Sequence, residues 1–551
     1  MNITTLGELI RNSSESFGEY PALGFVGEEA FKYNEFSSKI DNIISFLELN
    51  GIEQGDKVAI LSMNQPNWGI TFFALASMGV ITVPILPDFS VVEVENVMNH
   101  AEVKVIFVSE GLYRKVKVLK TDALKLVVSI DDFSVIPQGC PENKLNTLET
   151  SLVDLSKPIK QYTVLPDDVA SIIYTSGTTG KSKGVMLTHK NLVFNAKKSG
   201  TIHPMCTTDR MLSVLPLSHT YENTLGLILP IMSGTAIYYM RKPPVPSVLL
   251  PALSEIKPTI MLTVPLIIEK VYKGKVLPNI NSKAITKTLY KFAPTRKLLN
   301  KVAGKKLYET FGGHLLFFGI GGAKLDPEVE RFLVEAKFPY AVGYGLTETS
   351  PMLAGFDSFK GKYQSTGTTM EGVTLKINDL DPITGLGEIW AKGDNIMKGY
   401  YKEPEITAEV LTSDGWFKTG DLGSFDENGF LFIKGRLKNM IVGSSGENIY
   451  PEEIEAVINR FKYVLESVVV QQKGRLVALV HFNREELENI YKEFKEQANT
   501  YIDQKVEELS KELQVFVNEQ VNKFSRVQLV IVQTEPFEKT ATKKIKRFLY
   551  Y

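Results

Sequence analysis

From its N-terminus to about residue 385, the chain alternates short runs of β-branched and other apolar residues with longer segments of helical periodicity. The runs lie at 58–62, 80–83, 103–108, 126–130, 260–264 and 315–319. Short apolar runs separated by helices are typical of βαβ units, in which helices cover a parallel sheet. The pattern therefore predicts an α/β fold with mainly parallel sheets.

The pattern changes near residue 387. Short strands separated by Gly, Asp and Asn turns follow up to residue 432, which favours a small antiparallel or β-barrel-like part. After the junction Gly435-Arg436-Leu437-Lys438, the pattern indicates three more strands and a charged helical segment. The strands are expected at 467–471, 476–482 and 528–532, and the helix over about 485–524.

We therefore predict two domains. The large N-terminal domain covers 1–435 and the smaller α+β C-terminal domain covers 436–551. A chain of 551 residues exceeds what one hydrophobic core normally holds, which agrees with this division.

The composition is that of an ordinary globular protein, with 44% hydrophobic and 23% charged residues. The net charge of -1 gives no reason to expect a nucleic-acid partner. The two cysteines, Cys140 and Cys206, offer neither metal-ligand spacing nor a disulfide framework, so a reducing cytoplasm is expected. The N-terminus shows neither the basic start nor the apolar run of a signal peptide.

Two long stretches, 58–87 and 223–240, carry almost no charge and resemble membrane spans in hydropathy alone. The first contains Pro66 and Pro84, and the second contains Pro230 and Gly234. Because these residues interrupt helices, we interpret both stretches as strands and helices of a buried α/β layer.

The strongest chemical signal is a loop rich in Gly, Ser and Thr that follows an apolar strand expected at 170–174. It reads Thr175-Ser176-Gly177-Thr178-Thr179-Gly180-Lys181-Ser182-Lys183-Gly184. Glycines let backbone N–H groups turn toward an anion, hydroxyls add donors and lysines add charge, as a triphosphate requires. The loop is not a Walker motif, because Thr175 stands where that motif has its first glycine.

The order of this loop resembles the signature of the adenylate-forming superfamily, which includes acyl-CoA synthetases, adenylation domains of peptide synthetases and firefly-type luciferases. Further segments resemble family motifs in the expected order. They are Leu215-Pro216-Leu217-Ser218-His219, Gly321-Gly322-Ala323-Lys324-Leu325, Gly343-Tyr344-Gly345-Leu346-Thr347-Glu348-Thr349, Thr419-Gly420-Asp421, Gly435-Arg436-Leu437-Lys438, Glu447-Asn448-Ile449-Tyr450-Pro451 and 539–547. The resemblance implies activation of a carboxylic acid by ATP and Mg²⁺.

The resemblance also implies a nucleotide site. Tyr344 would stack on adenine beside Gly345, Asp421 would accept the ribose hydroxyls, and Arg436 would reach the ribose from the domain junction. The loop 175–184 would hold the phosphates, and the segment 321–325 would lie along the adenine. These residues are Thr175, Ser176, Gly177, Thr178, Thr179, Gly180 and Lys183 for the phosphates, and Gly322 and Ala323 for the adenine.

Four residues are implied in the chemistry. Thr347 would donate to the α-phosphate, Glu348 would bind Mg²⁺ through a hard oxygen, and His219 would lie beside the acyl channel. Lys544 matches the family lysine that bridges the carboxylate and the phosphate, although Lys543, where the family has glycine, leaves the choice between the two lysines open.

In the family the small C-terminal domain is mobile and swings between two half-reactions. Lys438 falls at the hinge, within 436–438, and Ser445 and Gly446 would line the tunnel for the thiol of coenzyme A. The motifs resemble the bacterial long-chain fatty acyl-CoA synthetases most. A fatty acyl-AMP ligase that loads a carrier protein, and a CoA ligase for medium-chain or aryl acids, stay open alternatives. A nucleotide sensor without catalysis is disfavoured by the joint presence of Glu348 and Lys544.

The segment 270–308 contains eleven lysines and arginines and no aspartate or glutamate. Apolar and aromatic residues are interspersed, so this basic stretch could rest on an anionic membrane at its inner face. A solvated basic face packed on the body of the protein is the alternative.

Overall fold

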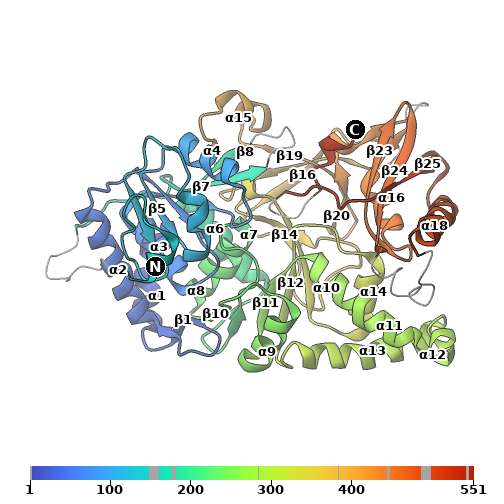
Figure 1. Cartoon of the computed structure of the whole chain (residues 1–551), viewed down its shortest axis with the longest axis horizontal. Helices are drawn as coiled ribbons and strands as arrows, with labels where there is room; N and C mark the ends of the chain where they lie inside the picture. The colour runs from blue at the N-terminus through green and yellow to red at the C-terminus, as the bar shows by residue number, and fades with distance from the viewer. Residues whose placement is uncertain are drawn as a thin grey trace.

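The computed structural model describes residues 3–147, 160–176, 182–282, 284–382, 384–443, 447–484, 498–540 and 545–551. Two large sheets and their helices form the body on the left and centre of Figure 1, and a small sheet with two helices lies at its right. The predicted α/β class with a C-terminal sheet is confirmed. The boundary at 435/436 and the mobility of the C-terminal part stay predictions.

The first large sheet has seven strands in the order β18-β8-β7-β4-β3-β5-β6. The pairs among β3, β4, β5, β6 and β7 are parallel, whereas β8 runs antiparallel to β7 and to β18. The strands are β3 (Lys57–Leu61), β4 (Ile81–Ile85), β5 (Val105–Val108), β6 (Leu126–Ser129), β7 (Val169–Ser176), β8 (Ser182–Thr188) and β18 (Gly399–Tyr400). The helices α2 (Tyr33–Leu49), α3 (Pro66–Met78), α4 (Val91–Ala101) and α6 (His189–Ile202) belong to the same part of the chain.

The second large sheet has nine strands in the order β15-β14-β13-β12-β11-β9-β10-β1-β2. Its central strands are parallel, so the carboxyl ends of β11, β12 and β13 lie at one edge. The strands are β1 (Pro21–Phe25), β2 (Phe31–Lys32), β9 (Arg210–Leu212), β10 (Ala236–Tyr239), β11 (Ile260–Thr263), β12 (Phe317–Ile320), β13 (Tyr340–Gly345), β14 (Met352–Gly355) and β15 (Thr368–Thr369).

The helices beside this sheet are α1 (Leu6–Phe17), α7 (Thr220–Asn223), α8 (Leu229–Ser233), α9 (Pro246–Ile256), α10 (Pro265–Val271), α11 (Leu277–Asn281), α12 (Ala284–Leu289), α13 (Ala293–Thr310) and α14 (Pro327–Ala336). A single apolar cluster joins residues of both large sheets, from Leu6 to Phe417. The two sheets therefore share one core.

The antiparallel part predicted after residue 387 is a four-stranded sheet in the order β16-β17-β19-β20, with α15 (Pro404–Val410) between β17 and β19 in the chain. Its strands are β16 (Thr374–Asn378), β17 (Gly387–Lys392), β19 (Phe417–Phe425) and β20 (Leu431–Arg436). A short pair, β21 (Ile441–Val442) and β22 (Asn448–Ile449), follows the junction.

The C-terminal sheet pairs β23 (Val464–Gln472) antiparallel to β24 (Arg475–Phe482), and β24 parallel to β25 (Leu529–Gln533). The predicted strands fall within one to three residues of these bounds. The helices α16 (Pro451–Ile458) and α18 (Ala498–Gln520) supply apolar residues to the same cluster as β23 and β24.

The uncharged stretch 58–87 forms β3, α3 and β4, and 223–240 forms a π-helical turn, α8 and β10 after the last residue of α7. Most of their residues are buried, as predicted, because they pack in the apolar clusters around the two large sheets. Among the described residues, no helix has both the length and the apolar character needed to cross a bilayer.

Candidate active site

Three of the predicted nucleotide residues contact one another. The Tyr344 hydroxyl donates a hydrogen bond to Asp421 Oδ2 at 2.7 Å, and Arg436 Nε lies 2.7 Å from Asp421 Oδ1. Only 7% of the Asp421 side chain is exposed, so its charge is balanced by Arg436 at short range. Burial, and next the charge of Asp421, raises the pKa of Tyr344 well above that of a free tyrosine, so its hydroxyl stays a donor.

The antiparallel pairing of β19 with β20 places Asp421 directly opposite Arg436. The Asp421 N–H donates to Thr419 Oγ1, which itself donates to the Ile389 carbonyl on β17. Side chains directly opposite on paired strands are close neighbours, so the pairing register fixes the ion pair. The motif Thr419-Gly420-Asp421 is therefore held by the small sheet, while Tyr344 reaches it from the end of β13.

Gly345, next to Tyr344, must be glycine. A Cβ at this position would lie 1.8 Å from the Pro351 carbonyl oxygen, since β14 folds back closely on β13 here. Any side chain would push the returning strand away and move Tyr344 with it. The close approach of β14 therefore explains why the motif 343–349 has glycine at position 345.

The strands β7 and β8, which flank the predicted phosphate loop in the chain, form a hairpin. The two strands pair from Val169↔Thr188 to Ser176↔Ser182, so Thr175 and Ser176 end one strand and Lys183 starts the other. The observed strand β7, Val169–Ser176, is three residues longer than the predicted strand at 170–174, because backbone pairing does not require apolar side chains. Gly177, Thr178, Thr179 and Gly180 lie outside the described residues.

Tyr400 connects the hairpin to Glu348. Its hydroxyl donates to Glu348 Oε1 at 2.9 Å, and Lys183 Nζ lies 5.0 Å from the centre of its ring. The short strand β18 pairs with β8, Tyr400 opposite Val185, which brings the ring near the loop end of the hairpin. The predicted phosphate residue Lys183 and the predicted magnesium ligand Glu348 therefore both contact Tyr400. Sequence reasoning missed this tyrosine, because its place depends on the pairing of two strands that are distant in the chain.

Thr347 and Glu348 form a 3-10 turn, Thr347–Thr349, that directly follows β13. The Met397 N–H donates to the Glu348 carbonyl at 2.9 Å, so the turn is tied to the segment that carries Tyr400. Mg²⁺ at nucleotide sites is held by one or two carboxylates together with phosphate oxygens and water. The half-buried carboxylate of Glu348, next to the hairpin predicted to bind phosphate, fits that donor set.

The loop after β12 lies beside the turn at Thr347 and Glu348, because β12 and β13 are parallel neighbours. Gly322 has φ of 86°, in the left-handed region that favours glycine, and both Gly322 and Ala323 are exposed. A Cβ on the preceding Gly321 would lie 3.0 Å from Cζ of Tyr221 on α7. The predicted adenine loop and the helix that follows His219 are therefore in contact.

His219 is the N-cap residue of α7. Its Nδ1 accepts a hydrogen bond from the Tyr221 N–H at 3.2 Å, so a neutral ring carries its hydrogen on Nε2. The contact fixes the ring at the start of a helix that touches the loop after β12.

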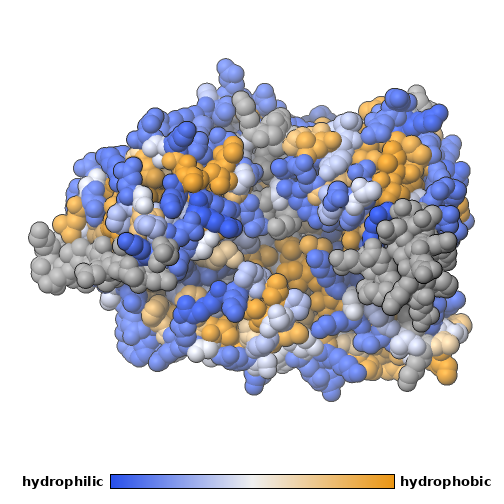
Figure 2. All heavy atoms as spheres, in the orientation of Figure 1, coloured by the Kyte–Doolittle hydropathy of each residue, from blue (hydrophilic) through white to orange (hydrophobic). Residues whose placement is uncertain are grey.

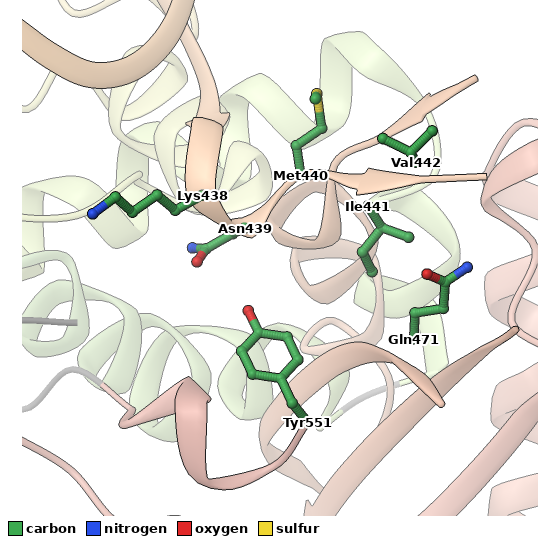
Figure 3. A pocket seen from close by; sticks show the side chains of 7 residues that line it. All are labelled: Lys438, Asn439, Met440, Ile441, Val442, Gln471 and Tyr551. Atoms are coloured by element: carbon green, nitrogen blue, oxygen red, sulfur yellow. The ribbon is translucent and has the colours of Figure 1, made fainter. Parts of the chain in front are cut away.

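Lys438, the predicted hinge residue, lies in a 3-10 turn, Leu437–Asn439, that directly follows β20. The turn forms one wall of a pocket of about 350 Å³, and Gln471 of β23 and Tyr551 form the opposite wall (Figure 3). The pocket therefore separates the junction at 437–439 from the C-terminal sheet. Ser445 and Gly446 lie outside the described residues.

The segment around Lys544 is anchored on both sides, while Lys543 and Lys544 themselves lie outside the described residues. On one side Lys539 pairs with Glu466, and an isolated bridge joins Lys539 to Ile545. On the other side both terminal nitrogens of Arg547 donate to the buried Glu455, at 2.6 and 2.7 Å. Bidentate pairs of this kind hold geometry well, so the ends of the segment are fixed to the C-terminal sheet and to α16.

A hydrogen-bonded group of Tyr344, Asp421 and Arg436, together with Glu348 and Lys183 around Tyr400, fits the site expected of an adenylate-forming α/β enzyme. The chain belongs to the family of AMP-binding enzymes, whose sequence model matches residues 10–401. The predicted resemblance is thereby confirmed.

Several relatives share most of the chain's length. The peroxisomal long chain acyl-CoA synthetase 7 of Arabidopsis thaliana is 30% identical over 527 residues, covering 88% of this chain and 74% of its own. The long-chain-fatty-acid–CoA ligase FadD15 of Mycobacterium tuberculosis is 30% identical and covers 80% of this chain and 75% of its own. The 4-coumarate–CoA ligase 1 of Arabidopsis thaliana is 32% identical, covering 77% and 72%.

Solved structures share the fold. ATP-bound MatB from Rhodopseudomonas palustris superposes with a TM-score of 0.75 at 21% identity, covering 99% of this chain and 98% of its own. The o-succinylbenzoate CoA synthetase of Bacillus subtilis, solved with ATP and magnesium, gives a TM-score of 0.74 at 20% identity, with 98% of each chain covered. At these identities the likeness establishes the fold.

Proposed function

We propose that this chain is a long-chain fatty acid–CoA ligase that works through an acyl-adenylate. The observation that carries the proposal is the contact among Tyr344, Asp421 and Arg436, next to the hairpin at Lys183, in a chain whose relatives include long-chain acyl-CoA synthetases. These side chains supply an aromatic face for adenine, a carboxylate for ribose and a cation for charge balance.

In the first half-reaction a substrate carboxylate attacks the α-phosphorus of ATP and pyrophosphate leaves. Both reactants are anions, so the protein must hold them together and neutralise the charge that develops. Lys183 would neutralise phosphate charge from the loop end of the hairpin, and Thr347 would donate to the α-phosphate. A magnesium ion held by Glu348 would supply further positive charge on the triphosphate.

We assign the bridging charge between carboxylate and α-phosphate to Lys544. The clamp formed by Arg547 and Glu455 lies three residues away along the chain and would give this lysine a fixed base. A compact ammonium on a flexible stem suits a group that must act in one half-reaction and leave in the next.

In the second half-reaction the thiol of coenzyme A attacks the acyl carbonyl and AMP leaves. We propose that 436–551 rotates about 436–438 between the steps, with Lys438 at the pivot and Ser445 and Gly446 beside the thiol path. The pocket between Asn439 and Tyr551 supports this idea, since space beside a pivot lets backbone angles change without steric clash.

The test is pyrophosphate release with a panel of carboxylic acids, with and without coenzyme A. A long-chain ligase should turn over continuously with coenzyme A and palmitate, but stop after about one turn without the thiol. Preference for 4-coumarate or a medium-chain acid would move the assignment to the corresponding alternative. Turnover that needs a pantetheinylated carrier protein and ignores coenzyme A would replace it by an acyl-AMP ligase.

We further propose that the basic segment 270–308 rests on an anionic lipid surface. Several apolar side chains of α12, α13 and the turn between them are largely exposed, with relative exposures of 74% for Ile285, 61% for Phe292, 64% for Leu298 and 55% for Val302. Exposed lysines flank them, namely Lys287, Lys291, Lys297, Lys301, Lys305 and Lys306. Apolar anchors ringed by lysines match the chemistry of an anionic bilayer surface.

The opposite face of α13 is already occupied. Arg296 pairs with Glu335 of α14 at 2.8 Å, and a Cβ on Gly304 would lie 2.4 Å from the Ala336 Cβ. Because α13 packs on α14 through Arg296 and Gly304, the face with Leu298 and Val302 stays exposed to solvent. Figure 2 shows hydrophobic and hydrophilic side chains side by side at the lower right, where Figure 1 places α12.

Sedimentation with vesicles tests this surface. The chain should bind vesicles that contain phosphatidylglycerol, and reversal of Lys297, Lys301 and Lys305 to glutamate should reduce binding at least about tenfold, at about 1 kcal/mol per lysine. Reversal of three exposed lysines elsewhere, at 117, 120 and 125, is the matched control. Equal binding by both triple variants would refute the proposal.

A further inference from the structure

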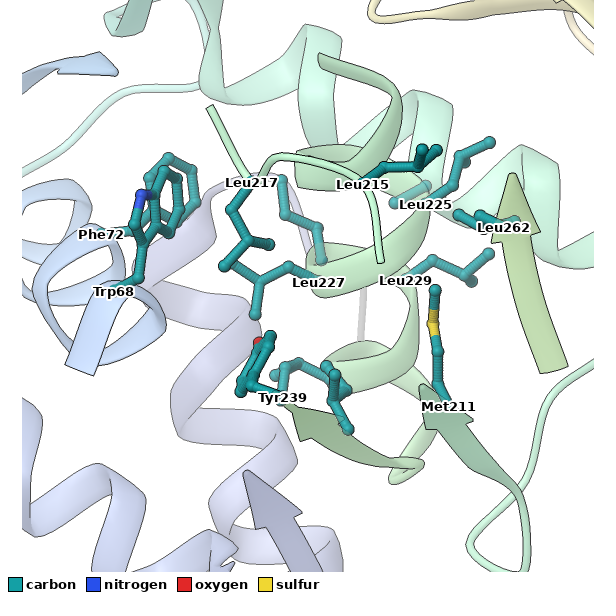
Figure 4. Close-up of a cluster of buried hydrophobic side chains, with 14 of the residues drawn as sticks. Trp68, Phe72, Met211, Leu215, Leu217, Leu225, Leu227, Leu229, Tyr239 and Leu262 are labelled. Carbon is teal, nitrogen blue, oxygen red and sulfur yellow. The ribbon is translucent and has the colours of Figure 1, made fainter. Parts of the chain in front are cut away.

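Glu222 is a carboxyl group in the apolar interior. It lies on α7, three residues after His219, with a relative exposure of 0%. Ser213 Oγ donates to its Oε1 at 2.5 Å, and Oε2 has no hydrogen-bond partner among the described residues. Figure 4 shows apolar side chains of the surrounding core, among them Leu217, Leu225 and Leu227, which flank Glu222 in the chain.

Ser213 connects Glu222 to the segment that holds His219. Asn64 Nδ2 donates to Ser213 Oγ at 2.9 Å and to the Leu215 carbonyl at 2.6 Å. The Leu217 N–H donates in turn to Asn64 Oδ1 at 2.9 Å. One relay therefore runs from the carboxyl through the end of β9 to the loop that precedes α7.

We propose that Glu222 is a positioning residue that acts in its protonated form. The neutral acid lets segment 213–219 and α7 pack against the loop after β12, whereas an ionised carboxylate at this fully buried position must gain water at Oε2, which opens that packing and slows adenylate formation. The inference rests on the proposed function for its activity readout only. The element displaced would be α7, whose Tyr221 touches Gly321 at the start of the predicted adenine loop.

The surroundings of Glu222 favour the neutral acid. A Cβ on Gly226 would lie 2.6 Å from the Glu222 carboxyl carbon, so the group packs directly on a π-helical turn, Thr224–Ile228. Burial raises the pKa of Glu222 to about 8, and the Ser213 hydrogen bond opposes this only in part.

The titratable groups that face the carboxyl are tyrosines, Tyr221 on its own helix and Tyr239 on β10, with Tyr33 of α2 behind Tyr239. Burial raises the pKa of all three, so these hydroxyls stay neutral together with the acid. His219, at the start of α7, is the nearest titratable group along the chain that can carry positive charge.

Several polar side chains of this segment contribute no hydrogen bond among the described residues. Thr220 Oγ1, both polar atoms of Asn223 and Thr224 Oγ1 are buried without a partner among the described residues. Buried polar atoms normally have partners, so the segment gains little from these side chains. A π-helical turn inside a helix is itself frequent at functional sites. The packing of the neutral Glu222 side chain, aided by the Ser213 hydrogen bond, therefore contributes to the positioning of the segment.

Amide exchange gives a readout that does not need the substrate. In peptides that cover 213–224, protection corrected for intrinsic rates should fall at least about fivefold from pH 7 to pH 9 in the wild type. In Glu222→Gln, which keeps the shape and cannot ionise, protection should stay constant. A wild type and a Glu222→Gln variant that lose protection equally would overturn the proposal.

Pyrophosphate exchange gives the second readout, and it omits coenzyme A so that thiol ionisation plays no part. A one-proton loss near pH 8 predicts an approximately tenfold fall in exchange rate by pH 9 in the wild type, and less than about twofold in Glu222→Gln. The matched control is Glu330→Gln, a buried acid on α14 that Tyr340 and Gln364 already bind, and it should keep the wild-type profile.

If Glu222→Gln does not fold, Ser213→Ala provides the alternative test. Loss of a donor that favours the ionised form should shift the alkaline fall to higher pH, whereas an unchanged profile would overturn the relay. A wild type that exchanges pyrophosphate with no fatty acid contradicts the proposed function, and amide exchange then still decides the role of Glu222.

Discussion

Replacing Glu222 with glutamine should stabilise the folded chain, and the gain should grow with pH. Burial raises the pKa of this carboxyl from 4.5 to about 8. Between these values the folded chain holds a proton that the unfolded chain has released, so wild-type stability falls as pH rises through this window. The loss is complete above the folded pKa, and glutamine has no such dependence.

The magnitude follows from the interval of about 3.5 pH units, at about 1.4 kcal/mol per unit, which gives ~5 kcal/mol as an upper value. The advantage of Glu222→Gln over the wild type should therefore be small at pH 4.5, increase by roughly 1.4 kcal/mol per unit, and level off above pH 8. A shift of this size is a large fraction of the stability of a typical domain.

Guanidinium unfolding at pH 5, 6, 7, 8 and 9 measures the difference, followed by the fluorescence of Trp68, which is fully buried in the same core. Glu15→Gln, at an exposed position, is the control and should give a difference that does not change with pH. An advantage of Glu222→Gln that is equal at pH 5 and pH 8 would refute the reasoning, because it would mean that Glu222 is ionised in the folded chain.

Three further substitutions separate the parts of the site. Asp421→Ala should raise the KM for ATP about 10- to 100-fold in steady-state assays, since the ribose loses its acceptor and Tyr344 its partner; an unchanged KM would contradict the assignment. Lys544→Ala should slow acyl-adenylate formation at least about 100-fold while thioester formation from supplied acyl-adenylate persists, and equal loss of both would argue against a bridging role. Arg547→Ala should cost about 3–5 kcal/mol in chemical unfolding of the C-terminal part, because Glu455 stays buried without its partner; recovery on also replacing Glu455 with leucine is the check.

Local patterns predicted the elements well. The apolar run at 260–264 is β11, Ile260–Thr263, and the run at 126–130 is β6, Leu126–Ser129. Apolar periodicity and turn residues are local properties, so they are readable without knowledge of partners. The order of strands in each sheet was not readable, because β1 pairs with β10 across more than 200 residues.

The candidate site was predictable where a motif carried it and unpredictable elsewhere. The contact of Tyr344 with Asp421 joins two motifs that are 77 residues apart. Tyr400 belongs to no motif that we recognised, and it joins the site only because β18 pairs with β8. A hydrogen bond between distant residues depends on sheet pairing, which the local sequence does not encode.

The sequence by itself determined the class of chemistry, since the spacing of Gly, Thr, Glu, Asp and Lys in ordered motifs limits which groups a site can bind. Only the tertiary structure decided which charged side chains are paired, which are exposed and which are buried. Arg296 is paired with Glu335 whereas Lys297 and Lys301 face outward, and Glu222 is an isolated acid rather than a surface charge. Burial and charge pairing arise from residues that are distant in sequence, so the ionisation state and accessibility of a side chain are set only when the chain has packed.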